Sequence, residues 1–466
     1  MLFNSFEFLL IFLPVVLGCA LLLRGNALLF WIALASCAFY AFAGHAWFLI
    51  PMAISTTLDF WVGQRIGASK NHRVRRAYLI LSLTANLGLL AYFKYSGLIA
   101  RTIEAALQTI APHSANAAWV NLFRVVLPAG ISFYTFQTIS YVIDIYRDES
   151  PPERNFLKYL SFVAFFPHLV AGPLTRHNQL IPQLTRIADR GISPRWRAGL
   201  MLFAVGLAKK VLIADRVGNA IDPVIAAIDA QGFASSWLVL FGYSVQIYFD
   251  FSGYSDMAIG LGRLFAVELP QNFNSPYQAT SPSDFWTRWH ITLSRWLRDY
   301  LYIPLGGNRK GEFRTKLNLM VTMVLGGLWH GANWTFALWG LFHGLLLWGY
   351  HATGPRWDEW PIWYRRVATY LLVTLAWVFF RAPTLQTAGH WFAGLAGWHG
   401  IGGIHALAPH TTFLILAAVI ASMTVRNVYE REIDTLSLFG AGVLGAVAGV
   451  ALVMMNYSSK FLYFQF

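Results

Sequence analysis

The sequence predicts an all-helical protein that crosses a membrane many times. Hydrophobic residues make up 56% of the 466 residues and charged residues only 12%, whereas roughly a quarter of a soluble chain is charged. The mean hydropathy is +0.49. Apolar runs of about 20 residues, long enough to span a bilayer, recur from one end to the other. Because no sizeable soluble domain fits between them, we expect one membrane-embedded domain over residues 1–466.

The apolar runs place the candidate membrane segments. They are Phe6–Leu23, Ala27–Phe42, Ala46–Val62, Ala77–Ile99, Val125–Ile145, Phe156–Ala171, Arg197–Ile213, Ser236–Leu261, Leu317–Tyr350, Val367–Phe380, Thr412–Met423 and Phe439–Met455. The first run lacks a basic leader, so it is predicted to be a retained span. The run that begins at Leu317 is too long for one crossing, and we expect a break at Gly326-Gly327. Pro167 interrupts a short run and predicts a re-entrant element. We expect about eleven membrane helices in all.

The basic residues lie between these runs. The net charge is +13, with clusters at Gly63–Arg76, Arg176–Lys210 and Gly306–Lys316. Short basic loops between spans are typically cytoplasmic. The clusters therefore predict which loops face the cytoplasm and that the protein lies in a lipid bilayer, and they do not indicate nucleic-acid binding. Cys19 and Cys37 both lie in apolar runs and read as small buried side chains. No metal-ligand spacing is present, so we predict neither a metal nor a resident cofactor.

One amphipathic helix is predicted between Ser281 and Gly307. Ser281 suits the N-cap and Pro282 the first helical turn. At about 100° per residue, the apolar side carries an aromatic stripe made of Trp286, Trp289, Leu293, Trp296, Leu297 and Tyr300. His290 lies about 40° from Trp286, at the border of this stripe. The pattern is typical of a helix at the membrane interface or against a helical bundle.

The strongest candidate for chemistry is His330. It lies in a stretch without Asp, Glu, Lys or Arg, from Leu317 to Pro355. A histidine in a membrane segment is costly and is by default a functional-site hypothesis; the alternative is a hydrogen bond between helices. In a continuous helix, Asn333 and Trp334 would share its face, whereas His343 would point about 140° away. We therefore expect His343 to pack rather than react.

Other polar residues in apolar runs are weaker candidates. Asp250 and Asp256 would not share a helical face, so paired acid–base chemistry is not expected. Ser252-Gly253 could mark a helix break capped by Asp250, and Arg263 is a possible partner for Asp256. For Asp250, and for His168 beside Pro167, a structural and a functional role are equally supported.

The loop Leu305–Gly311 joins two glycines to Arg309 and Lys310. Its backbone N–H groups and cations could hold a phosphate, although on the loop alone a topology anchor is favoured. Two functions remain open from the residues. One is a membrane enzyme with His330 as general base. The other is a proton-coupled transporter whose relay is His168, Asp250, Asp256, His290 and His330. The absence of an internal sequence repeat weakens the transporter.

The segments WTRWHITLSRWLRDYLYIPLGGNRKG and GGLWHGANWTF resemble the membrane-bound O-acyltransferase superfamily. MLFNSFEFLLIFLP, ISFYTFQTISYVIDIYR, FPHLVAGPLTR, YFDFSGYSDMAIGLG and FLYFQF are similar to its branch of bacterial alginate O-acetyltransferase membrane subunits. The resemblance covers nearly the whole chain and implies a helical bundle, with re-entrant and amphipathic helices, around a central tunnel. It implies catalytic roles for His330 and His290.

The same resemblance implies a multi-pass protein of the bacterial inner membrane. Acetyl-CoA would be the cytoplasmic co-substrate, and the acetyl group would reach periplasmic acetyltransferase partners that modify an alginate-like polysaccharide; cellulose or teichoic acid are alternative glycans. Supporting or tunnel-lining roles are expected for Asn333, Trp329, Trp334, Asp250 and His168. The CoA phosphates would contact Asn308, Arg309 and Lys310. Asn333 or a backbone N–H would hold the oxyanion.

Overall fold

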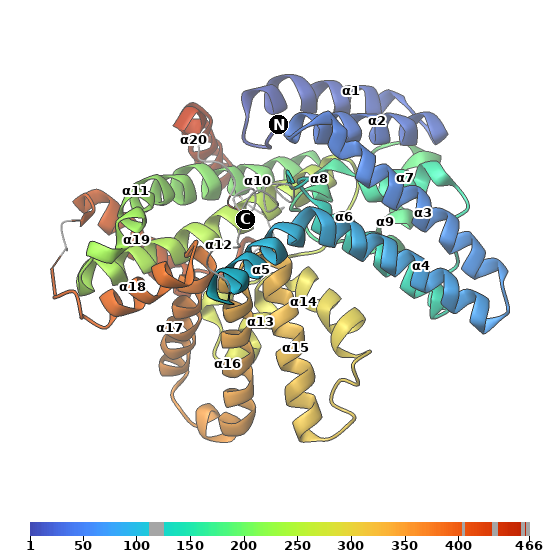
Figure 1. The fold of residues 1–466 in the computed structure, drawn as a ribbon. Coiled ribbons are helices and arrows are strands. Elements are labelled where there is room, and N and C mark those ends of the chain that lie inside the picture. The colour runs from blue at the N-terminus through green and yellow to red at the C-terminus, as the bar shows by residue number, and fades with distance from the viewer. Residues whose placement is uncertain (111–124, 403–405, 431–436, 458–461, 463–466) are drawn as a thin grey trace. The chain divides into compact units, whose positions relative to one another are not determined.

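The computed structural model describes residues 1–110, 125–402, 406–430, 437–457 and 462, and every regular element in these ranges is a helix (Figure 1). Apart from Leu462, the terminal motif FLYFQF lies outside the described residues. The chain divides into two compact units. Unit 1 is Met1–Gly199 with Leu261–Pro270, and unit 2 is Leu200–Gly260 with Gln271–Phe466. The expectation of a single membrane-embedded domain stays a prediction.

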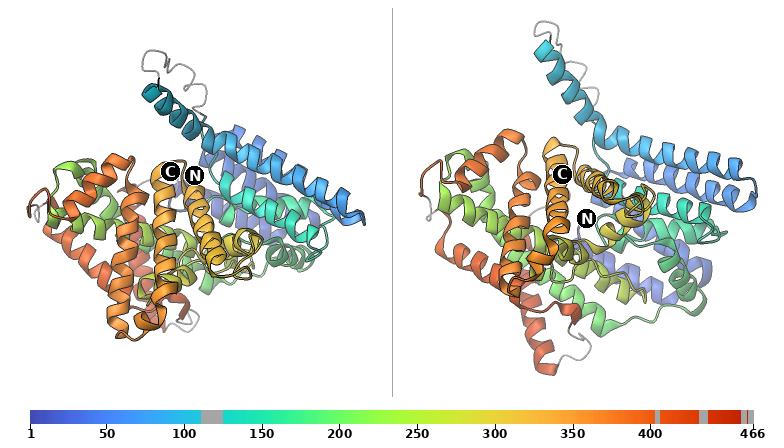
Figure 2. Two further views of the ribbon diagram at one scale, coloured as in Figure 1. Left: turned by 60° about the horizontal axis from the view of Figure 1, so that its bottom comes forward. Right: turned by 90° about the horizontal axis from the view of Figure 1, so that it is seen from below.

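Unit 1 is built from the N-terminal helices. They are α1 (Leu13–Leu22), α2 (Gly25–Ala43), α3 (Leu49–Ala68), α4 (His72–Leu90), α5 (Ser96–Ile110), α6 (Ile131–Tyr146), α7 (Phe156–Ala164), α8 (Phe166–Leu169) and α9 (His177–Arg190). A short π-helical turn, Ala91–Tyr95, joins α4 to α5, and the right-hand view of Figure 2 shows a bend between the two helices. The predicted partial element is two short helices that meet at Phe165, just before Pro167.

A buried polar cluster joins three helices of unit 1. Asp59 of α3 is fully buried and accepts hydrogen bonds from Ser82 Oγ (2.6 Å) and Asn86 Nδ2 (2.8 Å) of α4. Ser55 Oγ donates to Asn86 Oδ1 at 2.5 Å and lies 3.2 Å from the Thr138 hydroxyl of α6. Such polar contacts hold helices together where apolar packing gives no preference over lipid.

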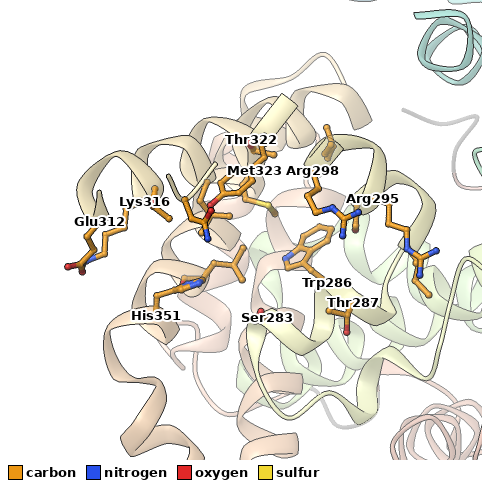
Figure 3. Close-up of a pocket in the computed structure, with 18 of the residues that line it drawn as sticks. Ser283, Trp286, Thr287, Arg295, Arg298, Glu312, Lys316, Thr322, Met323 and His351 are labelled. Atoms are coloured by element: carbon orange, nitrogen blue, oxygen red, sulfur yellow. The ribbon is translucent and has the colours of Figure 1, made fainter. Parts of the chain in front are cut away.

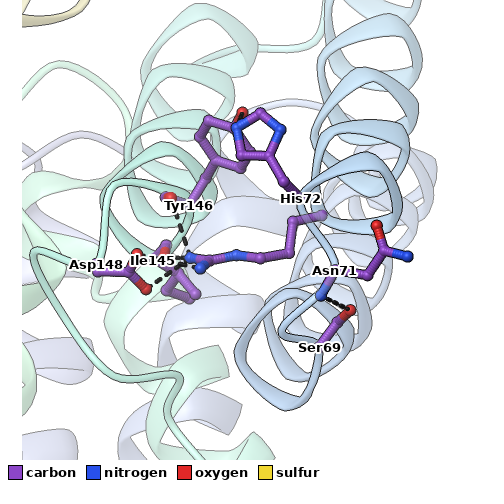
Figure 4. A network of polar contacts seen from close by, with 7 residues as sticks. Ser69, Asn71, His72, Ile145, Tyr146 and Asp148 are labelled. Carbon is purple, nitrogen blue, oxygen red and sulfur yellow. Dashed lines mark hydrogen bonds and ion pairs between the residues drawn. The ribbon is translucent and has the colours of Figure 1, made fainter.

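Arg75 links the start of α4 to the end of α6, where Figure 4 shows its partners Ile145, Tyr146 and Asp148. Its guanidinium donates to the carbonyl oxygens of Ile145 and Tyr146, each at 3.0 Å, and to Asp148 Oδ1 at 2.6 Å. It therefore satisfies carbonyls that a helix end leaves open. The hydrogen bond from Arg75 also holds the pKa of Asp148 below its usual value. His72 adds a contact of 3.1 Å between its Nε2 and the Tyr146 hydroxyl.

Unit 2 contains the C-terminal helices. They are α11 (Asp215–Ala226), α13 (Pro282–Arg288), α14 (Ile291–Leu297), α15 (Glu312–His330), α16 (Trp334–Asp358), α17 (Ile362–Arg381), α18 (Leu385–Leu395), α19 (Pro409–Thr424) and α20 (Leu438–Met454). Two helices, α10 (Trp196–Ala208) and α12 (Phe233–Leu264), belong partly to each unit. Helices α15, α16 and α17 pack side by side (Figures 1 and 2).

Glycines let α15 and α16 approach closely. A Cβ on Gly327 would lie 2.2 Å from the Phe336 carbonyl oxygen, and one on Gly340 would lie 2.2 Å from that of Met323. Small residues serve this purpose at helix contacts in membranes. The long run does divide into two helices, as expected, but the break lies between His330 and Trp334. Its expected position at Gly326-Gly327 is wrong, because both glycines lie inside α15 and Gly327 is needed for packing.

Within the part of the chain that the structure describes, three helices are long and apolar enough to cross a membrane by composition, namely Gly25–Ala43, Ala46–Ala68 and His72–Gln108. Shorter apolar helices occur at Phe8–Leu22, Pro409–Thr424 and Leu438–Met454. The expected number of about eleven membrane helices is thus not confirmed. A second correction concerns α12, which continues through Ser252-Gly253, where a break was expected.

Candidate active site

His290 and His330 come together in unit 2. Their ring centroids are 6.2 Å apart, and their exposed fractions are 0% and 5%. His330 is the last residue of α15, and His290 lies between α13 and α14. Hydrogen bonds to a reacting group are about 2.6–3.2 Å long, so one oxygen between these rings can be within reach of both.

The helix predicted to run through His290 is broken there. α13 ends at Arg288, α14 begins at Ile291, and His290 has φ 43° and ψ 52°. This left-handed conformation is strained for a residue with a Cβ, at a cost of about 1–3 kcal/mol, and such strain concentrates at functional sites. The break turns the imidazole into the interior. The N-terminal part of the prediction is confirmed, because Ser281 Oγ accepts a hydrogen bond from the Asp284 backbone N–H at 3.0 Å.

Asn272 fixes the orientation and tautomer of His290. Its Oδ1 accepts hydrogen bonds from the Thr292 backbone N–H (3.3 Å) and hydroxyl (2.8 Å), which identifies this atom as the oxygen. The His290 Nδ1, 3.1 Å away, is therefore the donor. In the neutral ring Nε2 then carries the lone pair. Sequence reasoning missed Asn272, because the contact joins residues 18 positions apart through a loop.

Aromatic rings enclose His330. Its ring centroid lies 5.0 Å from Trp329, 5.1 Å from Trp339 and 5.2 Å from Phe380. Trp329 also lies 6.0 Å from His290, so this predicted lining residue contacts both histidines. An apolar wall of this kind excludes water, which would otherwise hydrolyse a reactive acyl group.

The helix ends at His330 because of the three residues that follow. A Cβ on Gly331 would lie 2.0 Å from the Phe336 ring. Asn333 caps α16 by accepting from the Thr335 N–H at 3.4 Å, and its Nδ2 donates to the Pro383 carbonyl at 2.7 Å. The expectation that Asn333 and Trp334 continue the His330 face is therefore wrong. The Asn333 amide serves the backbone at both of these contacts, and its role toward an oxyanion stays a prediction. Trp334 is half exposed.

His343 packs among rings, as predicted for it. It is 1% exposed, and its ring centroid lies 4.8 Å from Trp339, 5.1 Å from Trp286 and 6.0 Å from Phe285. Trp339 thus contacts both His330 and His343.

The two aspartates of α12 pair with adjacent lysines. Asp250 Oδ1 lies 2.6 Å from Lys210 Nζ, which also lies 2.8 Å from Asp215. Asp250 Oδ2 accepts from the Leu462 N–H at 2.9 Å. Asp256 pairs with Lys209 at 2.6 Å, so Arg263, which lies 3.6 Å from Glu268, is not its partner.

His168 lies in unit 1 and is fully buried. Its Nε2 donates to the Phe162 carbonyl near the end of α7 at 2.9 Å. This contact satisfies a carbonyl that the end of α7 leaves open. The geometry gives His168 a structural contact, and a functional role stays a prediction.

A cavity of about 780 Å³ lies in unit 2, and its lining includes Ile291 and Trp286 (Figure 3). Trp286, Ile291, Leu297, Met323, Leu347 and His351 contribute to its wall. Its cationic side chains are Arg295, Arg298 and Lys316, and Figure 3 shows Trp286 between the arginines and Lys316. Of the three residues predicted to contact CoA phosphates, Asn308 lines the cavity, whereas Arg309 and Lys310 are outside the lining.

Two residues of the cavity lining, Ile291 and Trp286, connect it to the histidine pair. Ile291 directly follows His290 in the chain. Trp286 lies 5.7 Å from Trp339, whose ring contacts His330 at 5.1 Å. An aromatic pair therefore separates the cavity from the histidines.

Comparisons with known proteins agree with this arrangement. The profile of the membrane-bound O-acyltransferase family matches residues 147–380, which include both histidines. The probable alginate O-acetylase AlgI of Pseudomonas aeruginosa is 41% identical over 453 residues, covering 93% of this chain and 84% of that protein. The peptidoglycan O-acetyltransferase of Helicobacter pylori is 35% identical over 535 residues, covering 100% of this chain and 98% of that protein.

The teichoic acid D-alanyltransferase of Lacticaseibacillus rhamnosus is 30% identical over 238 residues, covering 47% of this chain and 57% of that protein. All three relatives are named for a transfer reaction rather than for transport. The chain is a membrane acyltransferase, and it belongs to the membrane-bound O-acyltransferase family.

Proposed function

We propose that this enzyme moves an acetyl group from cytoplasmic acetyl-CoA to a periplasmic acceptor that serves exopolysaccharide O-acetylation. The observation that carries the proposal is the adjacency of His290 and His330, 6.2 Å apart, inside an aromatic wall. The relatives named for O-acetyl transfer support acetyl as the group. The protein would act in the bacterial inner membrane as a bundle of about eleven spans.

The proposed reaction needs one general base, His330, and the thioester of acetyl-CoA, which is already activated for acyl transfer. His330 takes the proton of the acceptor hydroxyl as its oxygen forms a bond to the acetyl carbonyl carbon. The carbon–sulfur bond then breaks, and the thiolate of CoA receives the proton. A general base contributes roughly 10²–10⁴-fold in rate. His290, held by Asn272 with its Nε2 lone pair toward the interior, positions the acceptor or the thioester.

The 780 Å³ cavity is the donor site in this proposal. Its volume falls within the range of roughly 300–1,000 Å³ that is usual for small-molecule sites. Arg295, Arg298 and Lys316 in its wall supply charge for CoA phosphates. Arg298 and Lys316 would exchange their carboxylate partners, Asp299 at 2.7 Å and Glu312 at 2.5 Å, for the phosphates. The thioester end would then reach the histidines past Trp286 and Trp339.

Replacing Arg295 and Arg298 together with glutamine is expected to raise the KM for acetyl-CoA about tenfold or more, with kcat changed less than about threefold, because contacts remote from the thioester act mainly on binding. Initial rates with radiolabelled acetyl-CoA measure both constants. Arg309→Gln/Lys310→Gln serves as the matched control, since both residues lie outside the cavity lining. A larger KM effect for the control than for the arginine pair would indicate that the CoA phosphates bind at the loop Leu305–Gly311 instead.

The names of the relatives bear on the acceptor. One relative is named for alginate and another for peptidoglycan, and the teichoic acid relative matches less than half of the chain. We infer an alginate-like polysaccharide that is reached through periplasmic acetyltransferase partners. Purified protein incubated with radiolabelled acetyl-CoA and candidate glycans, with and without periplasmic extract, tests this. Label transferred directly to glycan without extract would remove the partner from the scheme.

The basic loops Arg65–Arg76 and Arg309–Lys316 are expected to be cytoplasmic, because both are short and positive. Ser69→Cys and Arg309→Cys, each in a chain without Cys19 and Cys37, should react with an impermeant maleimide only after cells are opened. Mass-shift labelling measures this. Reaction at Arg309→Cys in intact cells would place the donor cavity's basic loop on the wrong side for CoA.

A further inference from the structure

A second cavity of about 420 Å³ lies in unit 2, and its lining shares no residue with the proposed donor site. Part of its wall comes from α19 and α20, including Ala421, Val443, Leu444 and Val447. α20 is one of the apolar helices of 10–17 residues, and Val443 is half exposed. This apolar wall, open on the surface of α20, fits an acyl chain.

The polar end of this cavity contains a buried acceptor. Asn427 lines the cavity and is 7% exposed. Its Nδ2 donates to the Phe273 carbonyl at 2.8 Å. Its Oδ1 has no hydrogen-bond partner among the described residues. Buried polar atoms are almost always satisfied, so this amide oxygen is suited to a ligand that carries a hydroxyl donor.

The charge of the lining favours an anion. Lys209 is neutralised by Asp256 at 2.6 Å, and the Tyr429 hydroxyl also donates to Asp256, at 3.0 Å. Arg426 is exposed at the same cavity, and the lining contains no carboxylate among the described residues. A guanidinium beside an apolar wall matches a phosphate attached to acyl chains.

We propose that this cavity binds an anionic phospholipid whose headgroup carries a hydroxyl, as phosphatidylglycerol does. The phosphate contacts Arg426, a headgroup hydroxyl donates to Asn427 Oδ1, and an acyl chain lies along Val443 and Val447. Charge complementarity selects the phosphate, and the apolar wall selects a lipid over a free phosphate.

The site is connected to the histidine pair. Asn427 holds the carbonyl of Phe273, and Phe273 follows Asn272, which holds His290. The Phe273 and His290 ring centroids are 6.5 Å apart. A lipid that orders Asn427 therefore supports the segment that positions His290. This consequence rests on the proposed function, whereas the binding itself does not.

The test uses the full chain, delipidated in a neutral detergent, and native mass spectrometry with three lipids. Phosphatidylglycerol should bind, phosphatidylcholine should not compete, and phosphatidylmethanol, which has the same charge but no headgroup hydroxyl, should bind several-fold more weakly. Arg426→Gln should weaken phosphatidylglycerol binding about fivefold, while the control Arg356→Gln, at another exposed arginine, should not. Val447→Trp, which places a large ring in the part of the cavity proposed for the acyl chain, should weaken binding strongly.

Equal binding of phosphatidylcholine, or no effect of both Arg426→Gln and Val447→Trp, would overturn the proposal. Displacement of the lipid by glycerol 3-phosphate would assign the site to a free phosphate instead. Acetyl transfer in nanodiscs gives the separate readout. Phosphatidylglycerol should raise it in the wild type and not in Arg426→Gln. Binding without stimulation would remove the connection to His290, and absence of transfer in any lipid would contradict the proposed function instead.

Discussion

His330→Ala is expected to lower acetyl transfer by roughly 10²–10⁴-fold, the contribution of a general base, while the protein remains inserted and binds acetyl-CoA. The physical reason is that His330 takes the acceptor proton in the proposed reaction, while the rings of Trp329, Trp339 and Phe380 that surround it remain in the variant. Transfer of label from acetyl-CoA in membranes, normalised to the amount of folded protein, measures the effect. Retention of more than about a tenth of wild-type transfer would reject His330 as the base.

Two further histidine variants distinguish the loss of a base from damage to the aromatic packing. His290→Ala should lose less than His330→Ala if its part is orientation, and Asn272→Leu, which removes the acceptor for His290 Nδ1, should resemble His290→Ala. His343→Ala is the matched control, because it also contacts Trp339 and is equally buried. It should keep transfer near the wild-type level for each folded molecule. An equal loss in all three histidine variants would indicate damage to the aromatic cluster rather than loss of a base.

Local signals in the sequence predicted local structure well. Ser281 caps α13 as its position before a proline indicates, and the apolar runs became helices. The signal for the break after His330 was also local, since Gly331 and Asn333 are typical helix-ending and helix-capping residues. Gly326-Gly327 gives a competing signal, because a glycine pair can break a helix or let two helices approach. Only the position of Gly340 on α16 decides between these roles.

Contacts between distant segments could not be read from periodicity. The helical wheel placed His290 at the border of a continuous stripe, whereas the structure breaks the helix there and uses Asn272 to hold the ring. The adjacency of His290 and His330 came from family resemblance, not from spacing. The ion pairs of Asp250 with Lys210 and of Asp256 with Lys209 could not be predicted from the sequence either. A π-helical turn at Lys209–Ala214 lets two consecutive lysines reach aspartates that are six residues apart on α12.

Lys210→Met is expected to destabilise the protein by about 3–5 kcal/mol. Lys210 lies between Asp215 (2.8 Å) and Asp250 (2.6 Å), and the exposed fractions of all three side chains are 2% or less. Removing the cation leaves two buried carboxylates without their counter-charge, which costs more than losing an ion pair at the surface. The midpoint of thermal unfolding in detergent, together with the yield from membranes, measures the loss. Lys209→Met should cost less, because Lys209 is 17% exposed and Asp256 retains the Tyr429 hydroxyl.

A compensated variant separates stability from chemistry at Asp250. In Lys210→Met/Asp215→Asn/Asp250→Asn all three charges are gone, and a buried cluster replaced by neutral side chains of similar volume often regains its stability. If the triad serves only to hold α12 against the π-helical turn, this variant should recover much of the thermal midpoint and transfer acetyl groups normally. A triple variant that folds but does not transfer would give Asp250 a functional role. No recovery of stability would mean that the hydrogen bonds of the triad, including the Leu462 N–H on Asp250, matter more than its charge balance.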